Sequence, residues 1–466
     1  MLIELIAFSL LFTILALFRL DRAILLLIAA LPTYLIRFQV FNLPTTLLEI
    51  MILITFTVWL LKFYIPNFKN LLKNKKEKIN YPFSWELILV LIVSLAAAGV
   101  TGFSLSALGI WKAYFLEPIL LFILIFNVFK NKKDLLNILW AFLISAAAIS
   151  LFAIFQKITG LFIANPFWAA APTRRAVSFF GYPNAVGLYL APLIMIFIGW
   201  LFSYPWKNIY EQITQKIVIF LTVIISLFGI YAARSEGALI GVVAGLFIFG
   251  LLAGKKQKIV TLTLLIIIIG GVFWFAPTNN FVITKLTLHD LSGQIREQQW
   301  KETFSMLIPD RISTGAGLNN YQNAIKPYHQ EGIFFNSDNL PNFDAVVWAS
   351  STLRTKYWQP VEIYMYPHNI FLNFWSELGL IGALLFIWLI IKYLIISFKL
   401  ESTLSRSSNP DKYLTLGIMT AMITITIHGL VDVPYFKNDL ATMFWIFFAL
   451  LGFLNLNYRQ NKELKN

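Results

Sequence analysis

Long apolar runs separated by short polar segments make up most of this chain. A helix of about 18 or more apolar residues is long enough to cross the hydrocarbon core of a membrane. Such runs recur along the whole length and predict an all-α polytopic membrane protein with about 12–13 transmembrane helices. The predicted spans lie near residues 3–19, 23–40, 45–63, 84–102, 107–129, 135–158, 184–203, 217–233, 237–253, 259–276, 369–397, 413–431 and 440–457.

The composition agrees with this pattern, because 58% of the residues are hydrophobic, 13% are charged and the mean hydropathy is +0.73. Soluble domains have about a quarter of their residues charged. The first run, "MLIELIAFSLLFTILALF", has no basic n-region and no small-residue cleavage site, so we expect a retained helix rather than a removed signal peptide. The chain has no cysteine, which excludes disulfides, thiolate nucleophiles and Cys-ligated metals.

Lysines cluster in some of the loops and contribute to a formal net charge of +14. By the positive-inside rule these loops are cytoplasmic, and the loops between them fall on the outer side. We therefore interpret the basic charge as topology and expect no nucleic acid partner. The clusters are "KNLLKNKKEK" at 69–78, "KNKK" at 130–133, "KKQK" at 255–258 and the tail "YRQNKELKN".

One outer segment, residues 276–367, is far longer and more polar than the other connections. Loops of this length are usually functional. We therefore divide the chain into an N-terminal transmembrane bundle (1–275), this extracytoplasmic loop domain (276–367) and C-terminal transmembrane helices (368–466). Within the loop, "REQQWKETFSML" places Trp300, Phe304 and Leu307 on one helical face, which predicts an amphipathic helix lying on the membrane or over a cavity.

Ionisable residues near the outer ends of the spans need a reason, since a charge at the centre of a span costs at least about 2.5 kcal/mol. They could converge on one outward-facing cavity. Structural roles are the alternative: a Lys112–Glu117 pair, a polar turn at Arg234 and Glu236, or a cap or pair made by Glu377. These residues are Lys112, Glu117, Arg174, Arg175, Arg234, Glu236, Arg296, His368, Glu377, His428 and Asp432.

The arginines among them favour an anionic ligand. A guanidinium is always charged and binds phosphate in a bidentate fashion, so arginines at an outer membrane mouth fit a lipid-linked pyrophosphate. No Asp-x-Asp pair or His and carboxylate cluster has metal-ligand spacing, so we expect arginine rather than a divalent ion to meet leaving-group charge, and no cofactor. His368 is the natural general base, because an unperturbed histidine has a pKa of about 6.5.

The stretch "HNIFLNFWSELGLIG" resembles the signature of the O-antigen ligase and O-antigen polymerase superfamily. His368 and Asn369 are followed by nine residues and then by Gly379 and Gly382. Weaker resemblances follow in the family order, between about 159 and 440. They are "RAVSFFGYPNAVGLYL", "ARSEGALIG", "SGQIREQQWKETFSMLIPDRISTGAGLNNY" and "HGLVDVPYFKND".

The second of these departs from the family pattern, since Ser-Arg-Gly is Ser235-Glu236-Gly237 here, with Arg234 one place before the serine. Whether Arg234 replaces the usual arginine in space is open at this point.

The resemblance implies a metal-independent, inverting glycosyltransferase on the outer face of the bacterial cytoplasmic membrane. Its donor would be an undecaprenyl-pyrophosphate-linked glycan, and its acceptor hydroxyl would belong to a lipid A core sugar, another repeat unit or a protein Ser/Thr. Membrane lipids are the expected surroundings. His368 would be the catalytic residue. The expected substrate-binding residues are Arg175, Arg234, Arg296, Asn369, Glu236, Lys112 and His428.

Three other functions remain as alternatives. A lipid-linked oligosaccharide flippase also binds pyrophosphate with arginines, but it does not need a long outer loop or a histidine beside it. A cell-wall glycan polymerase of the shape and division type relies on an outer-loop aspartate, for which Asp310, Asp338 and Asp344 are candidates. A non-enzymatic membrane scaffold leaves the arginines and His368 unexplained.

A cysteine placed at Ser337, in a chain that has no cysteine of its own, should react with an impermeant maleimide in intact cells. The reason is the lysine asymmetry, which puts residues 276–367 outside. Labelling that requires cell lysis would contradict the predicted topology and the site built on it.

Overall fold

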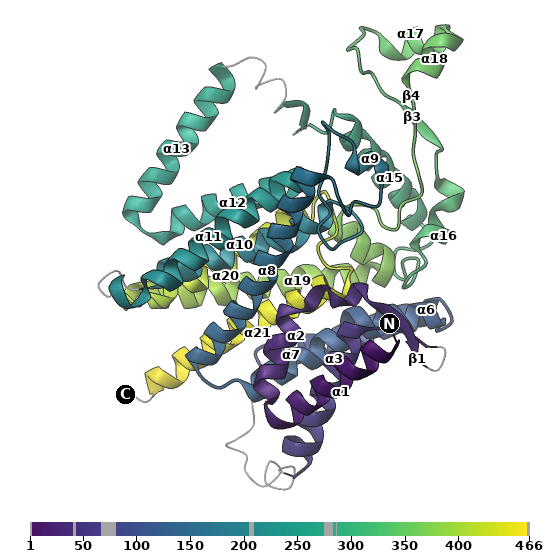
Figure 1. The fold of residues 1–466 in the computed structure, drawn as a ribbon. Coiled ribbons are helices and arrows are strands. Elements are labelled where there is room, and N and C mark those ends of the chain that lie inside the picture. The colour runs from purple at the N-terminus through teal and green to yellow at the C-terminus, as the bar shows by residue number, and fades with distance from the viewer. Residues whose placement is uncertain are drawn as a thin grey trace.

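Helices form nearly all of the secondary structure in the computed structural model, which describes residues 2–40, 43–66, 81–204, 209–274, 283–285 and 287–463 (Figure 1). The predicted basic loop at 69–78 lies outside the described residues. The first half of the chain contains α1 (Leu2–Phe18), α2 (Leu20–Ala29), the 3-10 helix η1 (Leu31–Leu35), β1 (Arg37–Val40), β2 (Leu43–Thr46), α3 (Leu47–Trp59), the π-turn η2 (Leu60–Tyr64), α5 (Ser84–Val100), α6 (Leu105–Trp111), the π-turn η4 (Lys112–Leu116), α7 (Glu117–Val128), α8 (Lys132–Thr159), α9 (Pro166–Ala169), α10 (Asn184–Ser203) and α11 (Ile209–Ala233).

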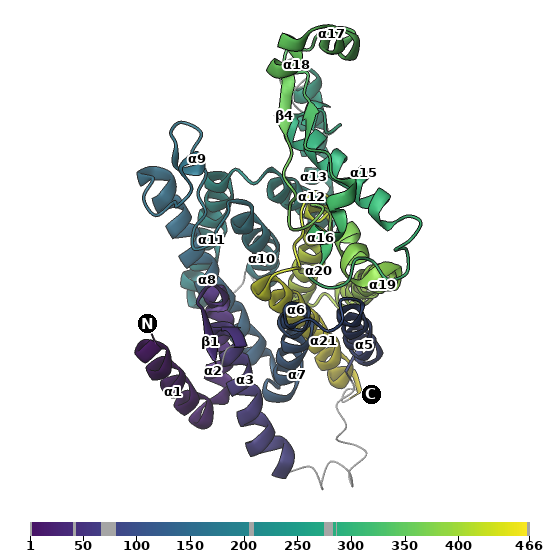
Figure 2. The same cartoon turned by 90° about the vertical axis from the view of Figure 1, so that its right-hand side faces the viewer.

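The second half holds the remaining transmembrane helices and the long loop. Its elements are α12 (Glu236–Ala253), α13 (Lys255–Trp274), α15 (Leu291–Leu307), α16 (Tyr321–Ile325), the 3-10 helix η6 (Lys326–Tyr328), β3 (Gly332–Phe334), α17 (Phe343–Ala349), α18 (Ser351–Tyr357), β4 (Trp358–Pro360), α19 (Ile370–Arg406), α20 (Asp411–His428) and α21 (Asn438–Glu463). The strands form two small antiparallel pairs, β1 with β2 and β3 with β4. In Figures 1 and 2, α17 and α18 form a lobe that projects furthest from the transmembrane helices.

The prediction of an all-α polytopic membrane protein is confirmed: within the described ranges, eight helical segments are long and apolar enough to cross a membrane. The segments Ile3–Phe18 and Ser84–Val100 are shorter apolar helices. The predicted span at 23–40 is wrong. Its helix, α2, ends at Ala29, Pro32 lies in the first turn of η1, and Arg37–Val40 then pairs with β2 as a hairpin. The proline removes a backbone donor, and the polar Arg37 and Gln39 suit a strand near water better than a span.

Close backbone contact between α10 and α20 forms the centre of the bundle. A Cβ on Gly199 would lie 2.6 Å from the Cα of Gly417, so both positions must be small for the helices to approach. Such small-residue contacts are a common basis of helix association in membranes. Because α20 also packs on α12 and α19, the pairing brings His428, Asn184 and Glu236 to one end of the bundle.

The opposite end of the bundle carries the basic turns. Lys132, at the start of α8, pairs with Asp411, at the start of α20. Lys255 follows the last turn of α12, and the first turn of that helix, at Glu236, lies at the end that carries His428. The charge asymmetry used to predict topology therefore separates the two ends of the helices, with the long loop at the end away from these lysines.

The helix α19 is interrupted at Gly379, which has a φ of 76°. The loop from Ser313 packs against this break: the amide of Ala316 donates to the carbonyl of Ser376 (2.6 Å), and the amide of Leu380 donates to Ile312 (3.0 Å). A Cβ on Gly379 would overlap the carbonyl oxygen of Ser313. Gly379 therefore serves the docking of the loop.

Glu377 anchors the same loop from inside the bundle. Its buried carboxylate accepts a hydrogen bond of 2.7 Å from the backbone amide of Asn319. This contact gives the carboxylate in the apolar run a structural role. It fixes the far end of the segment that begins at Ser313.

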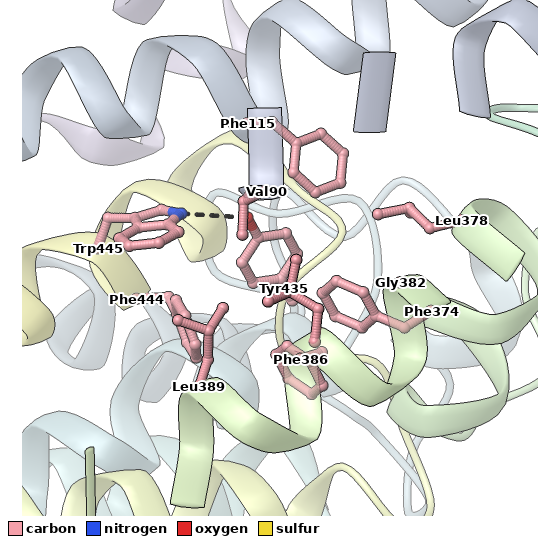
Figure 3. A pocket seen from close by; sticks show the side chains of 11 residues that line it. Val90, Phe115, Phe374, Leu378, Gly382, Phe386, Leu389, Tyr435, Phe444 and Trp445 are labelled. Atoms are coloured by element: carbon pink, nitrogen blue, oxygen red, sulfur yellow. Dashed lines mark hydrogen bonds between the residues drawn. The ribbon is translucent and has the colours of Figure 1, made fainter. Parts of the chain in front are cut away.

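On the other side of the break, α5, α19 and α21 enclose an aromatic core around Tyr435 (Figure 3). The Trp445 indole donates to the Tyr435 hydroxyl at 3.2 Å, and Phe374 stacks on Phe386 with centroids 3.8 Å apart. The enclosed volume is only about 10 Å³ and its walls are almost wholly apolar. A space of this size is a packing gap rather than a ligand site.

Replacing Gly379 by alanine should loosen the loop, because it adds a clash to a backbone conformation that itself costs about 1–3 kcal/mol without glycine. We expect a lower thermal unfolding midpoint and faster proteolysis between Ser313 and Asn319. Gly109→Ala in α6 is the control, since nothing lies within 4 Å of a Cβ there. Equal stability of the two variants would show that docking at Gly379 does not hold the loop.

Candidate functional site

A polar cavity of about 380 Å³ lies where α10, α12 and α20 meet the long loop. It contains six of the residues that the sequence pointed to: Arg175, Arg234, Glu236, Arg296, His428 and Asp432. We call it the arginine cavity. The full set of lining residues is Arg175, Asn184, Arg234, Ser235, Glu236, Gly237, Ile240, Lys285, Leu288, Asp290, Ser292, Arg296, His428, Val431 and Asp432.

Arg175 is oriented by uncharged acceptors. Its Nε donates to the carbonyl of Ala233 at 3.0 Å, and one terminal nitrogen donates to Oδ1 of Asn184 at 2.8 Å. The amide of Asn184 in turn donates to Asp432 at 3.0 Å. The neighbouring Arg174 turns away, since its guanidinium binds the carbonyls of Lys157, Ile158 and Ala169.

Arg234 and Glu236 form the turn between α11 and α12. Arg234 has a φ of 51°, a conformation uncommon outside glycine, and its guanidinium donates to the carbonyl of Pro172 at 3.2 Å. Glu236 forms a 2.7 Å ion pair with Lys285. Arg234 thus lines the same cavity as Arg175, although it stands one place before the position where the family pattern has its arginine.

The loop helix α15 lies over the cavity and carries Arg296. The guanidinium of Arg296 donates to the carbonyl of Val431 at 3.0 Å and to the hydroxyl of Ser292 at 2.8 Å. One turn later, Trp300 donates to the carbonyl of Pro367 at 2.9 Å. Of the two positions predicted for this helix, on the membrane or over a cavity, the second fits these contacts.

Gln299, which lies between Arg296 and Trp300 in α15, contacts His368. Its Oε1 lies 3.0 Å from Nδ1 of the imidazole. An amide oxygen only accepts, so Nδ1 carries the proton and Nε2 holds the lone pair. Nε2 makes no hydrogen bond to any residue in the described part of the chain. The neutral ring is thus oriented as a base with its accepting nitrogen open.

His368 adjoins the arginine cavity without lining it. Burial lowers the pKa of its imidazole below the ordinary value of 6.5, and so does Arg296, while Asp432 acts in the opposite direction. Burial is the largest of these effects, and it favours the neutral form that a general base requires. The rings of Tyr364 and Tyr366 flank the imidazole at 5.0 and 5.2 Å.

Two predicted binding residues have other contacts. Asn369 caps α19, accepting from the amides of Phe371 and Leu372, while its own amide donates to Leu430. Lys112 pairs with Glu49 at 2.8 Å and approaches Glu117 at 3.8 Å. Lys112 does not line the arginine cavity, and its contacts match the structural alternative raised for it.

The sequence did not single out Gln299, Asn184 or Lys285. Amides such as Gln299 and Asn184 have no motif of their own, and only the fold reveals which group they orient. Lys285 lies in the predicted outer loop, where no motif marked it. Within the described ranges, no group of three or more His, Asp or Glu side chains is placed to hold a metal ion.

Comparison with known proteins adds to this geometry. Residues 221–387 match the family described as O-antigen ligase, a region that contains Arg234, Arg296 and His368. No curated protein matches the chain in a direct sequence search. The chain is therefore a multi-pass membrane protein, and the match over residues 221–387 supports the O-antigen ligase and polymerase superfamily, a group associated with glycosyltransferase activity.

Proposed function

We propose that the protein transfers a glycan from an undecaprenyl-pyrophosphate-linked donor to an acceptor hydroxyl, with inversion and without a metal ion. One observation carries the proposal. Arg175, Arg234 and Arg296 all line one cavity, and within the described residues each guanidinium is held by carbonyl, amide or hydroxyl oxygens rather than by a carboxylate. Their charge is therefore oriented but not neutralised by direct pairing, as a pyrophosphate site requires.

The reaction follows from the position of His368 beside this cavity. Nε2 of His368 takes the proton of the acceptor hydroxyl as its oxygen attacks the anomeric carbon of the donor. The bond from that carbon to the pyrophosphate oxygen breaks, and its electron pair leaves with the pyrophosphate. The arginines stabilise the charge that develops there, and Gln299 keeps the imidazole in the required tautomer.

The arrangement favours transfer over the alternatives. A flippase must bind pyrophosphate, but it has no use for an oriented neutral imidazole beside the phosphate site. A shape and division type polymerase needs a loop aspartate at its site. None of the three candidates lines the arginine cavity, and the loop aspartate that does line it, Asp290, is paired with Lys285 at 2.8 Å. Asp338 lies in the loop that leads to α17 and pairs with Lys356. Asp344 belongs to α17 itself, and Asp310 follows α15.

Removing the imidazole should slow transfer while leaving the donor bound. His368→Ala and His368→Gln should bind undecaprenyl pyrophosphate normally and transfer glycan at least about a hundredfold more slowly, since a positioned base contributes about 10²–10⁴-fold. Because the pKa of His368 is lowered, the wild-type rate should fall only when the pH drops below 6.5. Loss of donor affinity with normal residual turnover would make His368 a phosphate ligand instead.

Arg175→Lys should impair donor binding even though it keeps the positive charge, because lysine cannot reproduce the planar fork that contacts Ala233 and Asn184. We expect the affinity for undecaprenyl pyrophosphate to fall by about tenfold, the effect of losing one charged hydrogen bond. Arg174→Lys is the matched control and should bind the donor as wild type does. Full donor affinity in both Arg175→Lys and Arg175→Ala would remove this residue from the site.

A further inference from the structure

A second polar cluster adjoins His368 outside the arginine cavity. Tyr366, whose ring flanks the imidazole at 5.2 Å, donates a 3.4 Å hydrogen bond to the hydroxyl of Tyr182. The ammonium of Lys437 lies 3.8 Å from the centre of the Tyr182 ring. None of these three residues lines the arginine cavity. We call Tyr182, Tyr366 and Lys437 the tyrosine–lysine cluster.

Lys437 is partly buried, yet its ammonium has no hydrogen bond or ion pair with a residue in the described part of the chain. A buried ammonium normally satisfies its three donors, so this one has donor capacity for a ligand. Asp432 and Asp439 favour its charge from a distance without pairing with it, and Arg37 acts in the opposite direction. The cluster therefore combines a free hydrogen-bond donor with aromatic faces.

This chemistry suits a sugar ring better than a phosphate. A pyranose presents a face of C–H groups to an aromatic ring and hydroxyl oxygens to a donor, and tyrosine is apolar on its face and polar at its tip. A phosphate has no C–H face to lay on the two rings, so it would leave both tyrosines unused. A serine or threonine side chain is too small to use two rings and an ammonium at once.

The geometry of an inverting displacement indicates whether this cluster would bind the donor sugar or the acceptor sugar. The nucleophile in an inverting displacement approaches opposite to the leaving group, so an acceptor cannot come from the cavity that holds the pyrophosphate. Short chain segments connect the two places: Asn184 lines the cavity two residues after Tyr182, and Asp432 lines it five residues before Lys437. His368 adjoins both.

We propose that the tyrosine–lysine cluster is the binding subsite for the acceptor sugar and hence that the acceptor is a glycan rather than a protein hydroxyl. This inference rests on the proposed function, because only a transferase needs a second substrate beside His368. In this arrangement Tyr182 and Tyr366 contact the face of the acceptor ring. Lys437 donates to one of its oxygens, and the reacting hydroxyl points to Nε2 of His368.

Protection of Lys437 from a small amine-acylating reagent tests the subsite without relying on transfer. Burial lowers the pKa of Lys437 to about 8, so much of the amine is neutral and reactive at pH 8. Labelling is followed by peptide mass spectrometry on the purified full-length protein in nanodiscs. The probes are methyl glycosides of glucose, galactose, mannose and N-acetylglucosamine, with mannitol, a serine-containing hexapeptide and inorganic pyrophosphate for comparison.

At least one methyl glycoside at high concentration should slow the acylation of Lys437 by about threefold or more, which corresponds to occupancy of most sites. Lys301, an exposed lysine of α15 that pairs with Glu297, is the internal control and should label at the same rate throughout. Tyr182→Leu should abolish the protection while undecaprenyl pyrophosphate still binds. His368→Ala should keep the protection, so that a failure of the catalytic proposal and a failure of this one give different results.

The inference is overturned if no glycoside protects Lys437, or if mannitol protects it as well as the glycosides do. Protection by pyrophosphate would make Lys437 part of the donor site, and protection by the hexapeptide would indicate a protein acceptor. Protection that survives in Tyr182→Leu would show that the tyrosine face does not bind the sugar.

Discussion

The contact of α15 with the segment before α19 is the constraint on which the site depends. Gln299 and Trp300 are adjacent in α15, and they hold His368 and Pro367 respectively. Arg296, one turn earlier on the same helix, reaches into the arginine cavity and binds the carbonyl of Val431. A single helix therefore sets His368, the proposed base, and Arg296, one of the proposed phosphate-binding arginines, relative to each other. Moving α15 would change both at once.

The rest of the fold keeps that helix in place. Its C-terminal half is tied to α16 by a hydrogen bond of 2.8 Å between Thr303 and Tyr321. Beyond it, the chain docks into the break of α19 at Gly379 and is held by Glu377. Met306 and Leu307 at the end of α15 also pack in a small apolar core with residues of α16, so burial and these directed contacts together determine the position of the helix.

The charged side chains at this end of the bundle are also positioned by directed hydrogen bonds. Polar groups near a membrane are costly unless they are satisfied, and here nearly all the guanidinium contacts go to backbone carbonyls and neutral side chains. Arg175 and Arg234 depend on the ends of α11 and the loop before α10, whereas Arg296 depends on α15. Three separate parts of the chain thus meet around the arginine cavity, and the connection after α20, which carries Asp432, also lines it.

The transmembrane helices were largely predictable, because apolar length is a strong signal for a span. The wrong prediction of a span at 23–40 shows the limit of this signal. The residues there are apolar enough for a span, but Pro32 and the hairpin Arg37–Thr46 interrupt the helix. Arginines and histidines could be selected because they are rare in such a chain, and most of those selected meet in the cavity. Their partners could not be selected in the same way, since Gln299 and Asn184 acquire a role only through contacts that span many residues.

Lys112 shows a further limit of the sequence. A cation near the outer end of a span was expected to bind substrate, but a carboxylate on another helix, Glu49, pairs with it. Sequence reveals that a buried charge needs a partner without revealing whether the partner is a ligand or another side chain. That distinction depends on the packing of α3 against the helix that follows Lys112.

The most direct test of the account is a structure of the protein with a bound undecaprenyl pyrophosphate. The account predicts that the two phosphates lie within hydrogen-bonding distance of Arg175 and Arg296, that the polyprenyl-linked end remains on the membrane side, and that Nε2 of His368 faces the place of the anomeric carbon. Phosphates bound at Lys437, or at Lys112 among α3 and α7, with the arginine cavity empty, would contradict it.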